Sequence, residues 1–196
     1  MIFIVGLGNP GEEYAQSRHN TGRMLLERFA KKEDIALASK GVHFAHVGKG
    51  KLSDEPVTIM LPDTYMNKSG KSVVTLVKSA KQAEKLLVVY DDLDLPFGTV
   101  RMAFGRSSGG HNGVESIIKA LKTKDFVRIR VGVCPTTPSG KLRKPQGEDA
   151  VIKFLMGDFG TNEMAVLKKI EKQVFEGITL FATEGREVAT MAVNSK

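Results

Sequence analysis

The sequence of 196 residues predicts an α/β protein with one domain over residues 1–196, in which helices flank a twisted, mixed and mostly parallel β-sheet. Short apolar, β-branched runs alternate along the chain with segments of helical period, which is typical of parallel strands joined by helices. Residues 42–61 indicate a hairpin, so antiparallel strands join the same sheet. With 41% hydrophobic residues, the chain is able to bury one substantial core.

The strands are predicted where apolar runs end in turn residues. They cover residues 2–5, 42–47, 56–61, 86–90, 99–104 and 127–133. The helices are predicted where apolar residues recur with a period near 3.6. They cover about residues 21–33, 68–80, 113–122, 162–181 and 184–192. Residues 135–149 contain three prolines, two glycines and several charges, which predicts a loop, and we expect it to be a mobile gate beside the active-site crevice.

The charge of the chain predicts a polyanionic partner. The net charge is +7, and eight basic residues against Asp125 alone lie between Lys119 and Lys144. Within this stretch Arg128 and Arg130 alternate with valine and isoleucine, so the strand is expected to have one core face and one basic face. The alternative is an ordinary solvated basic surface.

Several classes of protein are excluded by simple features of the chain. No apolar run is long enough to span a membrane, so no membrane partner is expected. The N-terminal residues lack the basic and apolar regions of a signal peptide, and Cys134 is the only cysteine. We therefore expect a cytoplasmic protein without disulfides.

The glycines near the start match G-x-G-x-x-G over residues 6–11, the phosphate-binding turn of dinucleotide folds. However, Pro10 removes a backbone N–H donor that a pyrophosphate needs, and Glu12 and Glu13 place negative charge beside it. No acidic residue closes a second strand at the required distance. The pattern therefore does not predict a nucleotide cofactor.

Polar side chains follow several of the predicted strands or open the predicted helices. They are Asn9, His19, Tyr65, Met66, Asn67, Asp91, His111 and Asn112. In open α/β sheets ligands bind beyond the carboxyl ends of the strands, so these residues are expected to share one crevice. Taken singly, each has an ordinary structural role: asparagine in turns, histidine in a cap, aspartate at the end of a strand.

No spacing typical of a metal site or a serine nucleophile is present. His43 and His46 lie three apart in a predicted strand and face opposite sides, and neither H-x-x-x-H nor H-E-x-x-H occurs. A G-x-S-x-G turn is also absent. The sequence predicts neither a metal nor any other cofactor.

Five segments in the order "GLGNPGEEY", "RHNTG", "TYMNKSG", "DDLDLPFG" and "GGHNG" resemble the bacterial-type peptidyl-tRNA hydrolases over essentially the whole chain. The chain departs from the usual pattern at Leu61-Pro62-Asp63, where a lysine often precedes the proline, and at "VGVCP", which replaces a glycine-rich run. The resemblance implies a hydrolase in translation that cleaves the ester between peptide and tRNA. Stalled peptides are thereby released, the tRNA is reused and ribosomes are rescued. It also implies a monomer.

The resemblance assigns a role to each polar residue of the crevice. His19 is the general base on water, Asp91 orients and stabilises its imidazole, and Asn9 discriminates a peptidyl from an aminoacyl ester. The resemblance places the remaining residues around the substrate. Asn67 and Asn112 hold peptide and ester, and Tyr14 and Tyr65 lie near the substrate end. Met66 shapes the peptide channel, and His111 assists in positioning or proton movement. The basic segment then neutralises tRNA phosphates through Arg128, Arg130, Lys141, Arg143 and Lys144.

Two other classes of function remain open at this stage. A non-catalytic RNA-binding module is supported by the charge, and it predicts that His19→Ala leaves biological activity intact. A nucleotide-dependent oxidoreductase is supported only by the opening glycines, and it predicts that NADH or flavin raises thermal stability.

Overall fold

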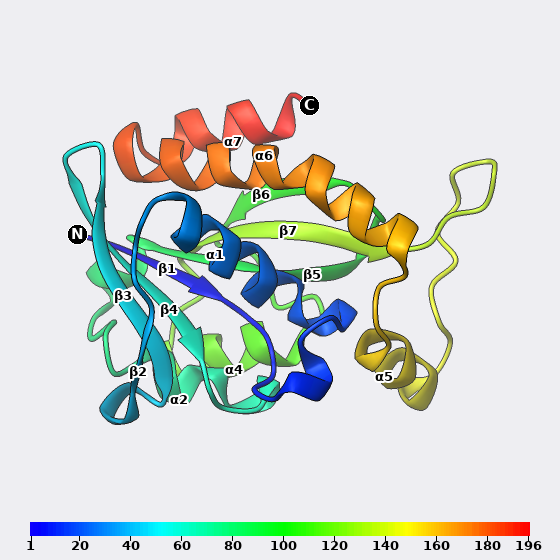
Figure 1. Ribbon diagram of the computed structural model, residues 1–196, viewed down its shortest axis with the longest axis horizontal. Coiled ribbons are helices and arrows are strands. Elements are labelled where there is room, and N and C mark those ends of the chain that lie inside the picture. Colours follow the sequence, from blue (N-terminus) through cyan, green and yellow to red (C-terminus); the bar gives the residue numbers. More distant parts are fainter.

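The computed structural model describes residues 1–196 and has one seven-stranded sheet with helices on both faces (Figure 1). The strand order is β2-β3-β4-β1-β5-β7-β6. The strands are β1 (Ile2–Gly6), β2 (Ala38–Lys40), β3 (Ala45–Leu52), β4 (Glu55–Pro62), β5 (Leu86–Pro96), β6 (Val100–Phe104) and β7 (Val127–Cys134). The four central strands β4, β1, β5 and β7 are parallel, and β2, β3 and β6 pair antiparallel at the two edges. The predicted mixed α/β sheet is confirmed.

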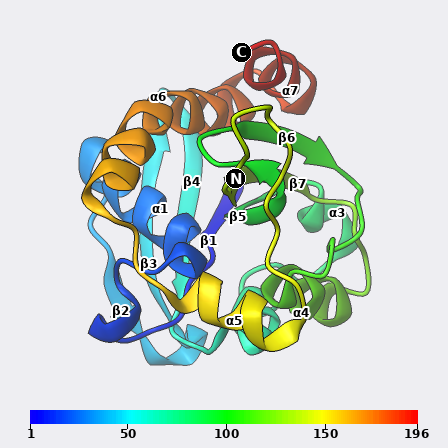
Figure 2. The same cartoon turned by 90° about the vertical axis from the view of Figure 1, so that its right-hand side faces the viewer.

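The helices divide the core between the two faces of the sheet (Figure 2). They are α1 (Thr21–Lys32), α2 (Ser69–Val73), α3 (Ala80–Ala83), α4 (Asn112–Leu121), α5 (Glu148–Met156), α6 (Thr161–Thr183) and α7 (Arg186–Asn194). The chain also has four short 3-10 turns, η1 (Glu12–Tyr14), η2 (Arg18–Asn20), η3 (Gly41–His43) and η4 (Met66–Lys68). Turns η2 and η4 lead directly into α1 and α2. Apolar residues of α1, α6 and α7 pack with Ile4 and Val89 on one face, whereas α2 and α4 pack with Val5 and Val88 on the other. No helix has the length and apolar character needed to cross a membrane.

Gly6, the last residue of β1, and Gly8 allow α1 to pack closely against the sheet. A Cβ on Gly6 would lie 2.6 Å from the carbonyl oxygen of Gly22 in α1, and one on Gly8 would lie 2.7 Å from the Cβ of Arg23. Any side chain at either position would push α1 off the sheet. This close approach gives Gly6 and Gly8 a structural reason that needs no bound phosphate.

Several predicted boundaries change in the structure. The prediction of one helix over residues 68–80 is wrong, because α2 ends at Val73 and a separate helix α3 begins after Ser79. The hydroxyl of Ser79 caps α3 by accepting the N–H of Gln82. The strand expected over 42–47 begins only at Ala45, because a 3-10 turn occupies residues 41–43. Helix α5 was not expected, and it takes the last two residues of the loop predicted over 135–149.

Strand β7 does not have the exposed basic face that its alternation predicts. Helices cover both faces of the central sheet, and Arg128 is fully buried. Its guanidinium donates to the carbonyl of Ser107 at 2.7 Å and lies over the ring of Phe126, 4.5 Å from the centroid. The expectation that Arg128 faces solvent is therefore wrong, because its side chain is not exposed at the surface.

Candidate active site

One cavity of about 680 Å³ lies at the carboxyl ends of the parallel strands. Strands β1 and β5 are neighbours with Gly6 opposite Val89, so the residues that follow them emerge at the same edge of the sheet. The structure brings together at this cavity most of the residues singled out in the sequence: Asn9, His19, Tyr65, Met66, Asn67, Asp91, His111, Asn112 and Lys144. They come from six separate segments of the chain, around Asn9, His19, residues 65–67, Asp91, residues 111–112 and Lys144.

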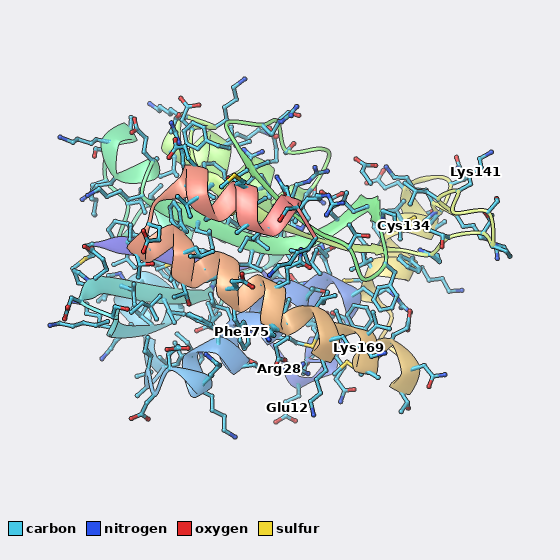
Figure 3. All side chains as sticks on the ribbon, turned by 90° about the horizontal axis from the view of Figure 1, so that it is seen from above. Glu12, Arg28, Cys134, Lys141, Lys169 and Phe175 are labelled. Carbon is cyan, nitrogen blue, oxygen red and sulfur yellow. The ribbon has the colours of Figure 1, made fainter.

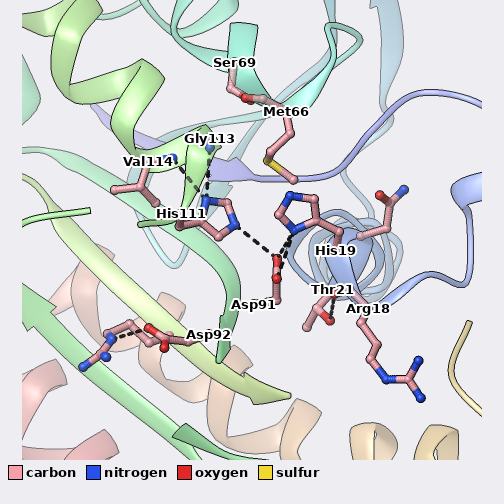
Figure 4. Close-up of polar contacts among 12 residues, drawn as sticks. Arg18, His19, Thr21, Met66, Ser69, Asp91, Asp92, His111, Gly113 and Val114 are labelled. Carbon is pink, nitrogen blue, oxygen red and sulfur yellow. Dashed lines mark hydrogen bonds and ion pairs between the residues drawn. The ribbon is translucent and has the colours of Figure 1, made fainter. Parts of the chain in front are cut away.

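His19 and Asp91 form the buried polar centre of this cavity (Figure 4). The His19 Nδ1 atom lies 3.1 Å from Oδ1 and 3.0 Å from Oδ2 of Asp91. Turn η2 carries His19 directly before α1, and Asp91 stands on β5 just after Tyr90. Both residues are largely buried, with 7% and 2% of their surface exposed. The hydrogen bonds of His19 use Nδ1 alone, so Nε2 remains available to a water or substrate.

His111 makes a second hydrogen bond to the same carboxylate, and its tautomer follows from its partners. Its Nδ1 accepts the backbone N–H groups of Gly113 and Val114 at 3.1 and 3.2 Å, which caps helix α4. Nδ1 therefore carries no proton, and the proton on Nε2 is donated to Oδ1 of Asp91 at 3.2 Å. Because His111 occupies one lone pair of the carboxylate, Asp91 is held in place from two sides.

The pKa values of the pair shift in directions that the contacts explain. Burial alone would lower the pKa of His19, but the charge of Asp91 and its hydrogen bond outweigh burial and raise this pKa above its ordinary value. Burial alone would raise the pKa of Asp91, but the charges of His19 and His111 and their hydrogen bonds hold it well below its usual range. Asp91 is thus an anion wherever the protein is folded near neutral pH. Burial, aided by the charge of Asp92, raises the pKa of Tyr90 to about 12.

Three potential metal ligands meet at this centre. The ligand atoms of His19, Asp91 and His111 all lie within 4.8 Å of one another. A metal on His111 needs the lone pair of Nε2, and its proton would then have to move to Nδ1. There it would oppose the two N–H groups that cap α4. The hydrogen bonds of this centre therefore do not fit a resident metal ion.

Asn9 is oriented by hydrogen bonds to Met66 and to the side chain of Asn20. Its Oδ1 accepts the backbone N–H of Met66 at 2.8 Å, so its Nδ2 donor is turned toward the cavity. The side chain of Asn20 accepts the N–H of Asn9 at 2.8 Å and donates to its carbonyl at 2.9 Å. Asn20 had only the signature of a turn residue in the sequence, and its position beside His19 was the one signal for a role at the site.

Tyr14 and the predicted basic residues other than Lys144 lie outside the cavity. Tyr14 is half-buried in η1 and does not line it. Arg130 is paired with Asp92 at 2.7 Å. Lys141 and Arg143 are exposed on a turn closed by the pairing of residues 136 and 142, which projects from the body of the protein (Figure 3). Lys144 lines the cavity and pairs with Asp94.

Helix α5 forms a wall of the cavity that the sequence did not predict. Its residues Val151, Ile152, Leu155 and Met156 line the cavity. These apolar residues recur at intervals of one and four residues, which is the amphipathic pattern that predicts a helix. The proline-rich segment before it hid that signal.

Known proteins resemble this chain over its full length. The sequence model of a family described as Peptidyl-tRNA hydrolase matches residues 3–196. A peptidyl-tRNA hydrolase of Dehalococcoides mccartyi is 38% identical over 196 residues and covers 100% of both chains. One of Syntrophotalea carbinolica is 36% identical and covers 100% of this chain and 98% of its own. The crystal structure of peptidyl-tRNA hydrolase from Acinetobacter baumannii superposes with a TM-score of 0.88 at 32% identity, covering 100% of this chain and 95% of that chain.

Proposed function

Because this chain belongs to the peptidyl-tRNA hydrolase family and hydrolyses peptidyl-tRNA, we propose that His19 takes the proton from the attacking water. The observation that carries this proposal is the buried His19–Asp91 pair, whose Nδ1–H is held by the carboxylate while Nε2 is free at the cavity. An imidazole with this tautomer is a general base near neutral pH. No hydroxyl or thiol hydrogen-bonds to His19, which supports direct attack by water without a covalent intermediate.

Asp91 acts on the base in two ways in this proposal. It fixes the Nδ1–H tautomer, and its negative charge stabilises the imidazolium that forms when the water loses its proton. His111 holds the carboxylate from the other side through Nε2–H. Since both nitrogens of His111 are used within the protein, we assign it to positioning and not to proton transfer.

The substrate is held by residues around the pair. Asn67 and Asn112 are exposed at the cavity, and their amides are suited to hold the peptide and the ester carbonyl. Tyr65 is 60% exposed beside them, which suits contact with the tRNA end. Met66 is buried below the cavity, where its flexible thioether shapes the peptide channel. Tyr14 lies farther away and is assigned only to the outer part of the substrate.

The test of the function is hydrolysis of N-acetyl-aminoacyl-tRNA by the purified protein in the presence of EDTA. We expect rapid cleavage of this blocked ester and much slower cleavage of the unblocked aminoacyl ester. A protein that binds tRNA but cleaves neither ester would support the RNA-binding alternative.

Asn9 is proposed to discriminate between these esters through its Nδ2 donor. A peptide carbonyl accepts this hydrogen bond, whereas the ammonium of an unblocked ester has no acceptor to offer. Asn9→Asp keeps an oxygen for the N–H of Met66 and replaces the donor with a charged acceptor. We expect the ratio of kcat/KM for blocked and unblocked esters to fall by about tenfold or more. An unchanged ratio in Asn9→Asp would remove Asn9 from this role.

The exposed turn over residues 136–142 is proposed to contact tRNA phosphates together with Arg143. Replacing both Lys141 and Arg143 with alanine is expected to raise KM and to reduce the slope of log KM against log salt by about 1 for each lost contact. The matched control is Lys49→Ala with Lys51→Ala, two exposed lysines on the β3–β4 hairpin. Equal slopes in all three proteins would contradict a phosphate contact at this turn.

We also infer a cytoplasmic location and a monomeric state. Peptidyl-tRNA arises where ribosomes work, and the proposed base, its carboxylate and the substrate amides all come from one chain at one cavity. The gating motion expected of residues 135–149 stays a prediction.

A further inference from the structure

Arg18, the residue before the proposed base, contacts the end of α5, the link that follows it and the first turn of α6. The Nη2 atom of Arg18 donates to both carboxylate oxygens of Glu163, at 3.0 and 2.8 Å. Its Nη1 atom donates to the carbonyl of Gly157 at 3.1 Å and to that of Phe154 at 3.5 Å. The guanidinium also lies over the ring of Phe154, 4.6 Å from the centroid. Only 14% of the Arg18 side chain is exposed.

The backbone on either side of Arg18 also contacts the link between α5 and α6, and we call this set of contacts the junction. The N–H of Arg18 donates to the carbonyl of Gly157 at 3.1 Å, and the N–H of Phe159 donates to the carbonyl of Gln16 at 3.0 Å. Ser17 and Asp158 form an isolated antiparallel bridge between these two stretches. The turn that carries His19 is therefore joined directly to the link between α5 and α6.

Helix α5 depends on this junction for its position. None of its residues is fully buried, and of its side chains only Phe154 and Leu155 pack against the edge of the hydrophobic core, so few core contacts of its own fix it. Its apolar face instead lines the cavity, where Ile152 is 50% exposed. At its last residue, the Met156 sulfur lies 3.8 Å from Nδ2 of Asn9. A small rotation about the α5–α6 link would move this whole wall relative to His19.

We propose that Arg18 is a positioning residue that sets the apolar wall of α5 at a fixed distance from His19, so that the peptide part of the substrate is gripped between them. The inference rests on the proposed function, since it assumes that the cavity holds a peptide. The planar fork of arginine meets one carboxylate and two carbonyls at once, which a lysine ammonium on a flexible stem does not reproduce. Glu163 is fixed in turn, because its Oε2 accepts the N–H of Gly160 at 2.8 Å.

The variants Arg18→Lys, Arg18→Met and Glu163→Gln test this inference on two peptidyl-tRNAs, one with a single N-acetylated residue and one with an N-acetylated tripeptide. We expect KM for the tripeptide ester to rise by about tenfold, KM for the single residue to rise less than about threefold, and kcat to stay within about threefold, the pattern of lost binding without lost chemistry. Amide hydrogen exchange over residues 148–156 is expected to accelerate in the same variants.

The matched control breaks another arginine–glutamate pair of the same helix α6. Arg28 and Glu171 join α1 to α6 at 3.1 Å, away from the cavity, and Arg28→Lys and Glu171→Gln are expected to leave both KM values unchanged. A fall in kcat with both KM values unchanged would overturn the inference, and so would equal rises in both KM values. Should Arg18→Met fail to fold, Arg18→Lys and Glu163→Gln still decide the question. An inactive wild-type protein would contradict the proposed function itself.

Discussion

Replacing His19 with alanine is expected to lower kcat/KM for N-acetyl-aminoacyl-tRNA by about 10²- to 10⁴-fold, the usual contribution of a general base. The loss should fall mainly on kcat, because the ring acts on water in the transition state and contributes little to binding the ground state. Single-turnover hydrolysis at saturating enzyme measures this step directly. The thermal stability of the variant should be measured alongside, because Asp91 loses a buried hydrogen-bond partner. This loss lowers the free energy of unfolding by about 1–3 kcal/mol.

The chain offers a matched control in a second histidine–aspartate pair. His46 lies 2.9 Å from the carboxylate of Asp63, but its side chain is 40% exposed, against 9% for His19, and it is not at the cavity. His46→Ala is expected to keep kcat/KM within about twofold, because an exposed ion pair contributes only about 0–1 kcal/mol to stability and this one is not at the cavity. A His19→Ala protein as active as His46→Ala would show that another group activates the water.

Asp91→Asn is expected to lower kcat by about 10²- to 10⁴-fold with the fold retained. The carboxylate accepts N–H groups from His19 and His111 at once, whereas an amide has a single oxygen and opposes the second N–H with its own donor. His19 is then expected to turn or to change its tautomer, which leaves no lone pair at the cavity. Asp63→Asn, which alters the exposed pair, is the control and is expected to keep full kcat.

The pH dependence separates the two effects of Asp91. The base works when His19 is neutral, so activity is lost as the pH falls through the pKa of His19, and Asp91 places this limb above the ordinary value of about 6.5. Without the carboxylate only burial remains, and burial lowers the pKa. The acid limb of the residual activity in Asp91→Asn is therefore expected at lower pH than in the wild type. A limb at the same pH in both proteins would show that a different group titrates.

Much of the fold follows from local patterns, and the exceptions have physical causes. Strand β1 and helices α1, α4 and α6 lie within a few residues of their predicted positions, because their apolar period and flanking turn residues agree. The prediction of one helix over residues 68–80 failed because Val73 and Val77 have helical spacing and are buried, yet Ser79 caps a new helix, α3, that begins at Ala80. Such a cap competes with helix propagation, and apolar spacing alone does not reveal it.

Arg128 shows where a pattern in one strand is insufficient. Alternation predicts which residues share a face of β7, but whether a side chain on that face meets solvent depends on what packs against it. Here Lys124 and Ser107 supply carbonyls to the guanidinium, and the ring of Phe126 covers it. The buried guanidinium therefore contacts the loop before His111 and is not exposed to a phosphate.

The sequence by itself determined the family, the α/β class and the set of polar residues at the strand ends, because strand polarity places those residues at one edge of the sheet. Only the tertiary structure decided how these side chains are oriented and which partners they contact. The proton positions on His19 and His111, the direction of the Asn9 amide and the attachment of α5 through Arg18 depend on partners up to 147 residues away. Hydrogen bonds are directional and short, so this chemistry is decided by the distances that packing sets and not by residue type alone.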